Sequence, residues 1–183
     1  MKSTSLPSFS AAKSAGFTLV ELMITIVIFA ILAAIAIPSF TSTIRNNEIV
    51  TDTSNLMSSL NEARSEAGKR SINVSACASA DGKTCSGSAT WSNGWIVFTD
   101  ADKDGVAGTF DGDDKLLRTI SITSGTAITS TSGDSYVRFK STGEIANTSK
   151  VSFEITKTGC GSQEARNLTV QLTGLAAITK DDC

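Results

Sequence analysis

The feature that most limits this chain is an apolar run near its start. The run extends from Phe17 to Ile37, contains 21 residues and carries one charged side chain, Glu21. As an α-helix, with a rise of about 1.5 Å per residue, it just crosses a hydrocarbon layer about 30 Å thick. The run therefore predicts a single membrane-spanning helix.

The basic residues around this run predict its orientation. Lys2 and Lys13 precede it, and the next basic residue is Arg45. Because positively charged flanks stay on the cytoplasmic side, residues 1–16 are expected in the cytoplasm and the bulk of the chain outside it.

An ordinary secretory signal peptide is the simplest alternative. The lysines, the apolar run and the small-residue pattern at Ala34 and Ala36 fit its three regions. However, the apolar core of such a peptide is about 7 to 15 residues long, and it does not begin with a carboxylate. An acidic side chain in a membrane segment costs free energy, so Glu21 points to a function and needs a cationic partner.

The residues around Glu21 resemble a known processing site. The segment Ala15-Gly16-Phe17-Thr18-Leu19-Val20-Glu21 is similar to the cleavage site of type IV prepilins and type II secretion pseudopilins. The resemblance implies that a prepilin peptidase cuts after Gly16 and that Phe17 is then N-methylated. It also implies that Glu21 aligns incoming subunits by pairing with an exposed terminal amine.

The helix is expected to continue beyond the apolar run. Pro38 follows the run and, because it lacks an N–H and clashes with the preceding turn, it should kink the helix. Residues 39–70 then form an amphipathic arm with one apolar stripe and with Asn47, Glu48 and Asp52 on the other side. Gly68, followed by Lys69 and Arg70, predicts the end of the helix. The stripe consists of Ile49, Thr53, Leu56, Leu60, Ala63 and Ala67.

The remaining part of the chain, residues 71–183, is expected to be a β-rich domain. Six segments alternate or are rich in β-forming residues, and clusters of Gly, Asp, Ser and Thr separate them. Residues 121–135 are of low complexity and are interpreted as a loop or an irregular edge strand. The expected fold is α+β, with the amphipathic arm across one face of a small antiparallel sheet. The predicted strands are 72–78, 95–99, 115–122, 135–140, 151–156 and 168–172.

Three segments of this domain resemble the GspH/FimT family, which includes FimU-like minor pilins. They are residues 94–100 (Gly-Trp-Ile-Val-Phe-Thr-Asp), 116–118 and 165–170. The resemblance implies a minor pilin that helps to start or cap a type IV pilus, or a type II secretion pseudopilin of the H type. Its partners would be other minor and major pilins or pseudopilins, the prepilin peptidase and the inner membrane, with the folded domain in the periplasm.

A second implication of this resemblance is DNA capture during natural transformation. Some FimT-like proteins bind DNA through arginines that follow a glycine near the C-terminus. Here that stretch, from Gly174 to Asp182, contains Lys180 and two aspartates but no arginine. After removal of residues 1–16 the chain has 14 basic against 18 acidic residues, a net charge of −4, so nucleic acid is not an expected partner.

An acidic cluster suggests a calcium site as an alternative to a plain turn. Asp100, Asp102 and Asp104 alternate before Gly105, and Asp111 stands at the twelfth position, where a calcium-binding loop of the EF-hand type has a glutamate. A polar hairpin turn explains the same residues without a metal. No other cofactor is expected.

The four cysteines are expected to form disulfide bonds, since they lie in a segment assigned to an oxidising compartment. Of three pairings, sequence separation favours Cys77 with Cys85 and Cys160 with Cys183. Zinc binding is disfavoured because the chain has no histidine and no Cys-x-x-Cys pair. The absence of histidine and of a nucleophile motif also argues against an enzyme.

Overall fold

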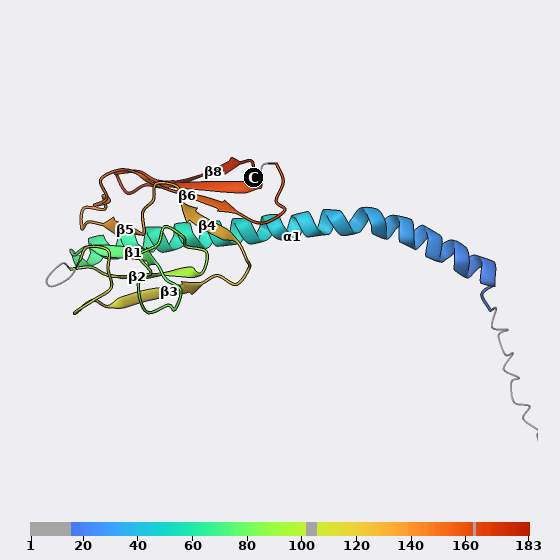
Figure 1. Cartoon of the computed structure of the whole chain (residues 1–183), viewed down its shortest axis with the longest axis horizontal. Helices are drawn as coiled ribbons and strands as arrows, with labels where there is room; N and C mark the ends of the chain where they lie inside the picture. The colour runs from blue at the N-terminus through green and yellow to red at the C-terminus, as the bar shows by residue number, and fades with distance from the viewer. Residues whose placement is uncertain (1–15, 102–105, 163) are drawn as a thin grey trace, which may run out of the picture. The chain divides into compact units, whose positions relative to one another are not determined.

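The computed structural model describes residues 16–101, 106–162 and 164–183 (Figure 1). The chain divides into two compact units, with the boundary between Phe40 and Thr41. One long helix, α1 (Leu19–Arg70), contributes to both units, and eight strands follow it. The prediction of an α+β fold is confirmed. Asp102 and Asp104 of the acidic cluster lie outside the described residues.

The part of α1 in the first unit exposes its side chains. The most apolar 18 residues of this helix are not buried by any other part of the structure that is described. The helix is long and apolar enough to cross a membrane. An unpartnered apolar surface of this kind is stable only in lipid or against other apolar helices.

The second part of α1 confirms the amphipathic pattern. All six residues of the predicted stripe, from Ile49 to Ala67, are at most 1% exposed. Asp52, expected on the polar side, is 6% exposed instead, because it accepts a hydrogen bond of 2.6 Å from Ser124 Oγ. The stripe is therefore the face that packs on the strands.

The end of α1 agrees with the predicted end of the arm at residue 70. The helix passes through Gly68 and ends at Arg70, and Ser71 has a φ angle of 55°. This left-handed conformation is typical of the residue after a helix end, a position that glycine usually occupies.

The strands form two antiparallel sheets rather than the single sheet expected. The first has the order β3-β2-β1-β5 and the second the order β4-β6-β7-β8 (Figure 1). The first sheet consists of β1 (Val74–Ala78), β2 (Gly94–Thr99), β3 (Leu116–Ser121) and β5 (Tyr136–Phe139). The second consists of β4 (Ala127–Ser130), β6 (Val151–Thr156), β7 (Ala165–Val170) and β8 (Ala176–Asp181).

Two strands were not among the six predicted segments. β4 forms within residues 121–135 and lies at the edge of the second sheet, in agreement with the irregular edge strand considered above. β8 was not predicted at all, since its sequence does not alternate and its side chains are almost all exposed. Pairing with β7, from Ala165↔Asp181 to Val170↔Ala176, makes this segment a strand.

One buried cluster joins the helix to both sheets. It contains Leu56 and Leu60 of α1, Trp95 of β2 and Phe153 of β6, all at most 1% exposed. Trp91 packs edge-on against Phe153, with ring centroids 5.0 Å apart. Burial of these large side chains accounts for much of the stability of the second unit.

Candidate processing and assembly site

The residues around the predicted cleavage site lie at the start of α1. Gly16, Phe17 and Thr18 have no regular secondary structure, and the helix begins at Leu19. Phe17 is 84% exposed, and Glu21 is exposed in the first helical turn. The peptide bond between Gly16 and Phe17 is thus outside the helix.

Thr18 is the N-cap of α1, although it is not among the residues predicted above. Its hydroxyl oxygen accepts a hydrogen bond of 3.2 Å from the backbone N–H of Glu21, and its carbonyl accepts one of 3.1 Å from Leu22 N–H. The spacing Thr-x-x-Glu is the sequence signature of a capping box and could have identified Thr18. The cap fixes Glu21 at the third helical position, where a carboxylate also favours the positive end of the helix dipole.

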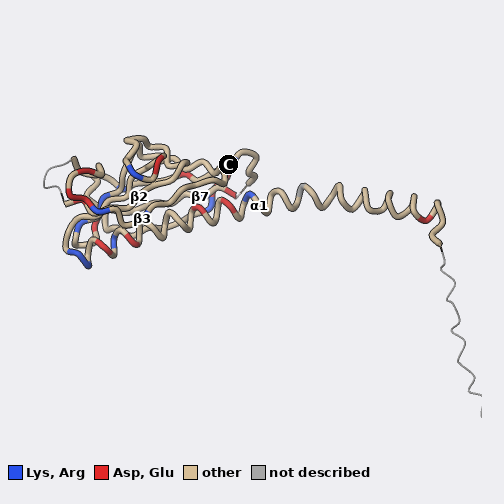
Figure 2. Tube along the Cα trace, turned by 90° about the horizontal axis from the view of Figure 1, so that it is seen from below, with Lys and Arg blue, Asp and Glu red and all other residues tan. Residues whose placement is uncertain are grey.

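Glu21 is the only charged residue in this apolar part of α1. Figure 2 shows this single acidic position, and other charges appear only in the second part of the helix. Nearly every side chain around it is apolar and exposed, including Leu19, Leu22 and Ile24 at 55% or more. In such surroundings, a carboxylate is stabilised strongly by a cation from another molecule.

The helix does not end at Pro38. α1 is continuous through this position, from Leu19 to Arg70. Proline removes one intrahelical hydrogen bond without necessarily terminating the helix. The kink at Pro38 stays a prediction.

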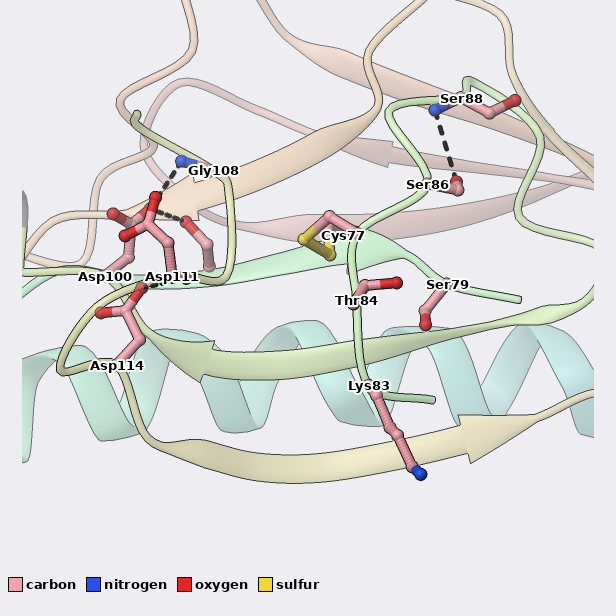
Figure 3. The surroundings of a disulfide bond; sticks show 12 residues. Cys77, Ser79, Lys83, Thr84, Ser86, Ser88, Asp100, Gly108, Asp111 and Asp114 are labelled. Carbon is pink, nitrogen blue, oxygen red and sulfur yellow. Dashed lines mark hydrogen bonds between the residues drawn. A yellow bond between two sulfur atoms is a disulfide. The ribbon is translucent and has the colours of Figure 1, made fainter. Parts of the chain in front are cut away.

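Both favoured disulfide pairings are present. Cys77 of β1 bonds to Cys85, with 5.6 Å between their Cα atoms, and Cys160 bonds to Cys183 near the C-terminus, with 6.0 Å. Cys77 is buried with Ile96 and Phe98, so the first bond holds the loop after β1 against the first sheet (Figure 3). The second bond ties the end of the chain to the segment between β6 and β7.

The loop closed by Cys77 and Cys85 is organised around Asp81. Its Oδ1 accepts hydrogen bonds of 2.8 Å from the N–H groups of Lys83 and Thr84, and Oδ2 accepts one of 2.9 Å from the Thr84 hydroxyl. The bonds from Lys83 N–H, Thr84 N–H and the Thr84 hydroxyl, in this order, hold the pKa of Asp81 well below its usual range.

Asp100, one of the expected calcium ligands, makes several contacts within the chain. It is 2% exposed, and its Oδ2 accepts hydrogen bonds from Ser75 Oγ at 2.5 Å and Gly108 N–H at 2.8 Å (Figure 3). Arg138 Nε forms an ion pair with the same oxygen at 3.0 Å. A guanidinium beside this oxygen competes with any metal ion for it.

Asp111 and Asp114 of this loop accept hydrogen bonds from backbone N–H groups. Asp111 Oδ2 accepts a weak hydrogen bond of 3.3 Å from Val106 N–H, and Asp111 N–H donates to Asp114 Oδ2 at 3.4 Å. Burial raises the pKa of Asp114. Within the described parts of the chain, no three acidic, histidine or cysteine side chains form a metal-binding group. The calcium site, with Asp102 and Asp104 outside the described residues, stays a prediction.

The segment considered for DNA capture forms the turn after β7 and strand β8. Lys180 lies opposite Arg166 in the register of these strands. Arg166 is only 7% exposed. Its guanidinium donates hydrogen bonds to Asn46 Oδ1 at 3.0 Å and to the Glu164 carbonyl at 2.8 Å. This arginine therefore connects β7 to α1.

Comparisons with known proteins agree with these features. The family model of the type II transport protein GspH matches residues 52–174, and the model of the prokaryotic N-terminal methylation motif matches residues 11–37. No curated protein matches the chain at a significant level.

Two solved structures of a type IV minor pilin share the fold, and a minor pseudopilin was also found. The type IV minor pilin FimU of Pseudomonas aeruginosa, in space group P21, has a TM-score of 0.56 at 19% identity, covering 73% of this chain and 89% of that chain. A second form, in space group P65, has a TM-score of 0.52 at 20% identity, covering 69% and 88%. The minor pseudopilin EpsH of Vibrio cholerae has a TM-score of 0.48 at 14% identity, covering 73% and 97%.

The match to the N-terminal methylation motif covers the predicted cleavage site and Glu21, and the likeness to FimU covers 73% of this chain. Since the GspH model matches more than half of the chain, this protein belongs to the GspH family of minor pilins and pseudopilins.

Proposed function

We propose that this chain is a minor pilin that is cleaved between Gly16 and Phe17 and takes part in the initiation or tip complex of a type IV pilus. The observation that carries the proposal is the exposed apolar part of α1, with Glu21 fixed in its first turn by the N-cap Thr18. This part of the helix serves first as an anchor in the inner membrane and then as the packing surface in a filament. The folded second unit lies on the periplasmic side.

The proposed mechanism follows from the electrostatics of the first turn. Cleavage after Gly16 creates an α-ammonium group on Phe17, four residues before Glu21. When a subunit leaves the lipid and joins neighbours, the carboxylate of Glu21 meets the ammonium of an adjacent subunit. This pairing compensates the cost of a charge in apolar surroundings and sets the axial register of the helices.

The choice of a pilus over a secretion system rests on the likeness to FimU, described as a type IV minor pilin. The family model is described as a type II transport protein, so an H-type pseudopilin is the alternative. Deletion of the gene that encodes this chain distinguishes a role in a pilus from a role in secretion. We expect loss of piliation and twitching, whereas loss of protein secretion with normal pili would support the alternative.

The processing step is tested by mass spectrometry of the protein isolated from membranes. We expect a mature chain that begins at Phe17 and carries one added methyl group. A mature chain that begins at another residue would contradict the proposal.

The role of Glu21 is tested by incorporation into sheared filaments. We expect Glu21→Ala to be processed and inserted in the membrane normally but to fall about tenfold in the filament fraction, as expected for loss of a desolvated ion pair. Glu154→Ala removes an exposed carboxylate from β6 and is the matched control. Normal incorporation of Glu21→Ala would rule out the mechanism.

A further inference from the structure

A polar groove lies between the last turns of α1 and the turn after β5. It has a volume of about 460 Å³, and its side chains come from Asn61, Arg64, Ser65 and Lys69 of the helix and from Ser141 and Thr142 of the turn. The lining contains two cationic side chains and several neutral donors, and no carboxylate. This composition suits an anionic oxygen group.

Arg64 is held in place at this groove. Its Nε donates to the Gly143 carbonyl at 2.9 Å and its Nη2 to the Thr173 carbonyl at 3.2 Å. Nη1 makes no hydrogen bond to any residue that the structure describes. A guanidinium fixed in this way loses little conformational entropy when its remaining nitrogen binds a ligand.

Lys69 is free to turn towards a ligand. Its ammonium pairs with Glu66 Oε1 at 2.9 Å, but the lysine side chain is 67% exposed. Exposed pairs of this kind contribute little to stability, so Lys69 can exchange Glu66 for another carboxylate at small cost. Glu66 also pairs with Arg70, at 2.7 Å, and would keep that partner.

The surface that leads to the groove favours a protein as the source of the anion. In residues 46–65 of α1, the most exposed residues are uncharged, and the charged ones are half-buried or buried. Exposed helix faces usually carry charges, and an uncharged ridge permits close packing by another protein. The ridge consists of Asn47, Val50, Thr51, Ser54, Ser58, Asn61 and Ser65. A polyanion is disfavoured by the net charge of −4 of residues 17–183.

We propose that this groove binds a carboxylate side chain of a neighbouring pilin-type subunit that packs along the uncharged ridge. The inference rests on the proposed function, since it requires an assembly with other pilins. Arg64 and Lys69 supply the positive charge, and the hydroxyl groups of Ser65, Ser141 and Thr142 supply further donors. The groove thus makes the choice of neighbour depend on charge. This contact adds to those that the apolar helices make with each other.

The test uses the full chain in cells, with a photo-crosslinking amino acid in place of Thr142 in the groove. A second probe replaces Phe29, an exposed residue of the apolar part of α1. We expect both probes to form adducts with pilin-type subunits, identified by mass spectrometry.

A carboxylate supplied by the chain itself should block the groove. Ser65→Glu places a carboxylate one turn before Lys69, a spacing that also favours the helix. We expect it to reduce the Thr142 adduct roughly tenfold, because it repels the carboxylate of the neighbour and occupies Lys69. Ser65→Gln, which has the same size and no charge, should leave the adduct within about twofold of its original level.

The outcomes separate the two proposals. Adducts at Phe29 without any at Thr142 would contradict the proposed role of the groove but not the proposed function. Equal Thr142 adducts in Ser65→Glu and Ser65→Gln would have the same meaning. A nuclease-sensitive adduct at Thr142 would replace the protein partner with nucleic acid and would also contradict the proposed role of the groove. Absence of pilin adducts at both positions would contradict the proposed function itself.

Discussion

At the scale of single residues, the buried pair of Asp100 and Arg138 connects four parts of the second unit. Asp100 follows β2, Arg138 belongs to β5, Ser75 to β1 and Gly108 to the loop before β3. The Ser75 hydroxyl, the Gly108 N–H group and Arg138 Nε all contact Oδ2 of Asp100. Arg138 Nη2 also donates to the Asp100 carbonyl at 3.2 Å. Charges as buried as these are stable only with such a set of partners.

Loss of this charge should strongly destabilise the fold. We expect Asp100→Asn to lower the free energy of unfolding by about 3 kcal/mol, because it leaves the buried Arg138 charge without its partner. The melting temperature should fall by about 10 °C. The exposed Asp113→Asn serves as the control. An equal effect of both substitutions, or recovery of Asp100→Asn by millimolar calcium, would contradict the structural role.

The second residue with a clear electrostatic role is Asp81. Its folded-state pKa is lower than its ordinary value, mainly because the N–H groups of Lys83 and Thr84 stabilise the charged form. Its contribution to stability is therefore fully present above the ordinary pKa. It is lost as the pH falls towards the folded-state pKa.

Asp81→Asn should make this contribution visible. We expect a lower melting temperature than the unchanged protein at about pH 7, and a difference that shrinks below about pH 4, where the unfolded aspartate becomes protonated. Thermal melts over this pH range provide the measurement. A difference that is constant with pH would show that the carboxylate charge has no part in it.

At the scale of elements, α1 combines two different surfaces in one helix. Its first part is apolar on all sides, whereas its second part buries only the stripe from Ile49 to Ala67. The same backbone thus presents one surface to lipid or neighbouring helices and another to its own sheets. This division explains why a single continuous helix can be both an anchor and a core element.

The end of α1 offers a stabilising substitution. Ser71 has a φ angle of 55° and an exposed side chain. Because glycine adopts this conformation without a steric cost, we expect Ser71→Gly to stabilise the second unit by about 1 kcal/mol. Ser71→Ala, which keeps the Cβ atom, should give no gain. Chemical denaturation measures both, and a loss of stability in Ser71→Gly would contradict this account of the helix end.

At the scale of the whole molecule, the second unit contains its own core and both disulfide bonds. Residues 41–183 form one compact unit, and all members of the buried clusters belong to it. None of residues 16–40, the described part of the first unit, belongs to these clusters. The anchor should therefore be dispensable for folding, though not for assembly.

Removal of the anchor tests this independence. We expect residues 41–183, secreted to an oxidising compartment, to be soluble, to contain no free thiol and to unfold in one cooperative thermal transition. Circular dichroism and thiol titration provide the readouts. Aggregation together with a gradual, non-cooperative melt would show that the fold needs the first part of α1.

The sequence by itself determined the features that depend on local pattern. The apolar run with Glu21, the stripe from Ile49 to Ala67 and most strand positions follow from hydropathy, periodicity and β-forming residues, which act over neighbouring positions. The disulfide pairing of Cys77 with Cys85 and of Cys160 with Cys183 followed from short loop lengths. The capping role of Thr18 could also have been found, from its spacing to Glu21.

Only the tertiary structure decided the features that depend on partners distant in the chain. β8 is a strand because β7 pairs with it, although its own sequence shows no alternation. Asp100 stands among other acidic residues in the sequence, and only the fold brings Arg138 to it across 38 positions. The division into two sheets and the groove at Arg64 have the same origin. Hydrogen bonds and ion pairs of this kind join residues that are far apart in the chain, so no local pattern encodes them.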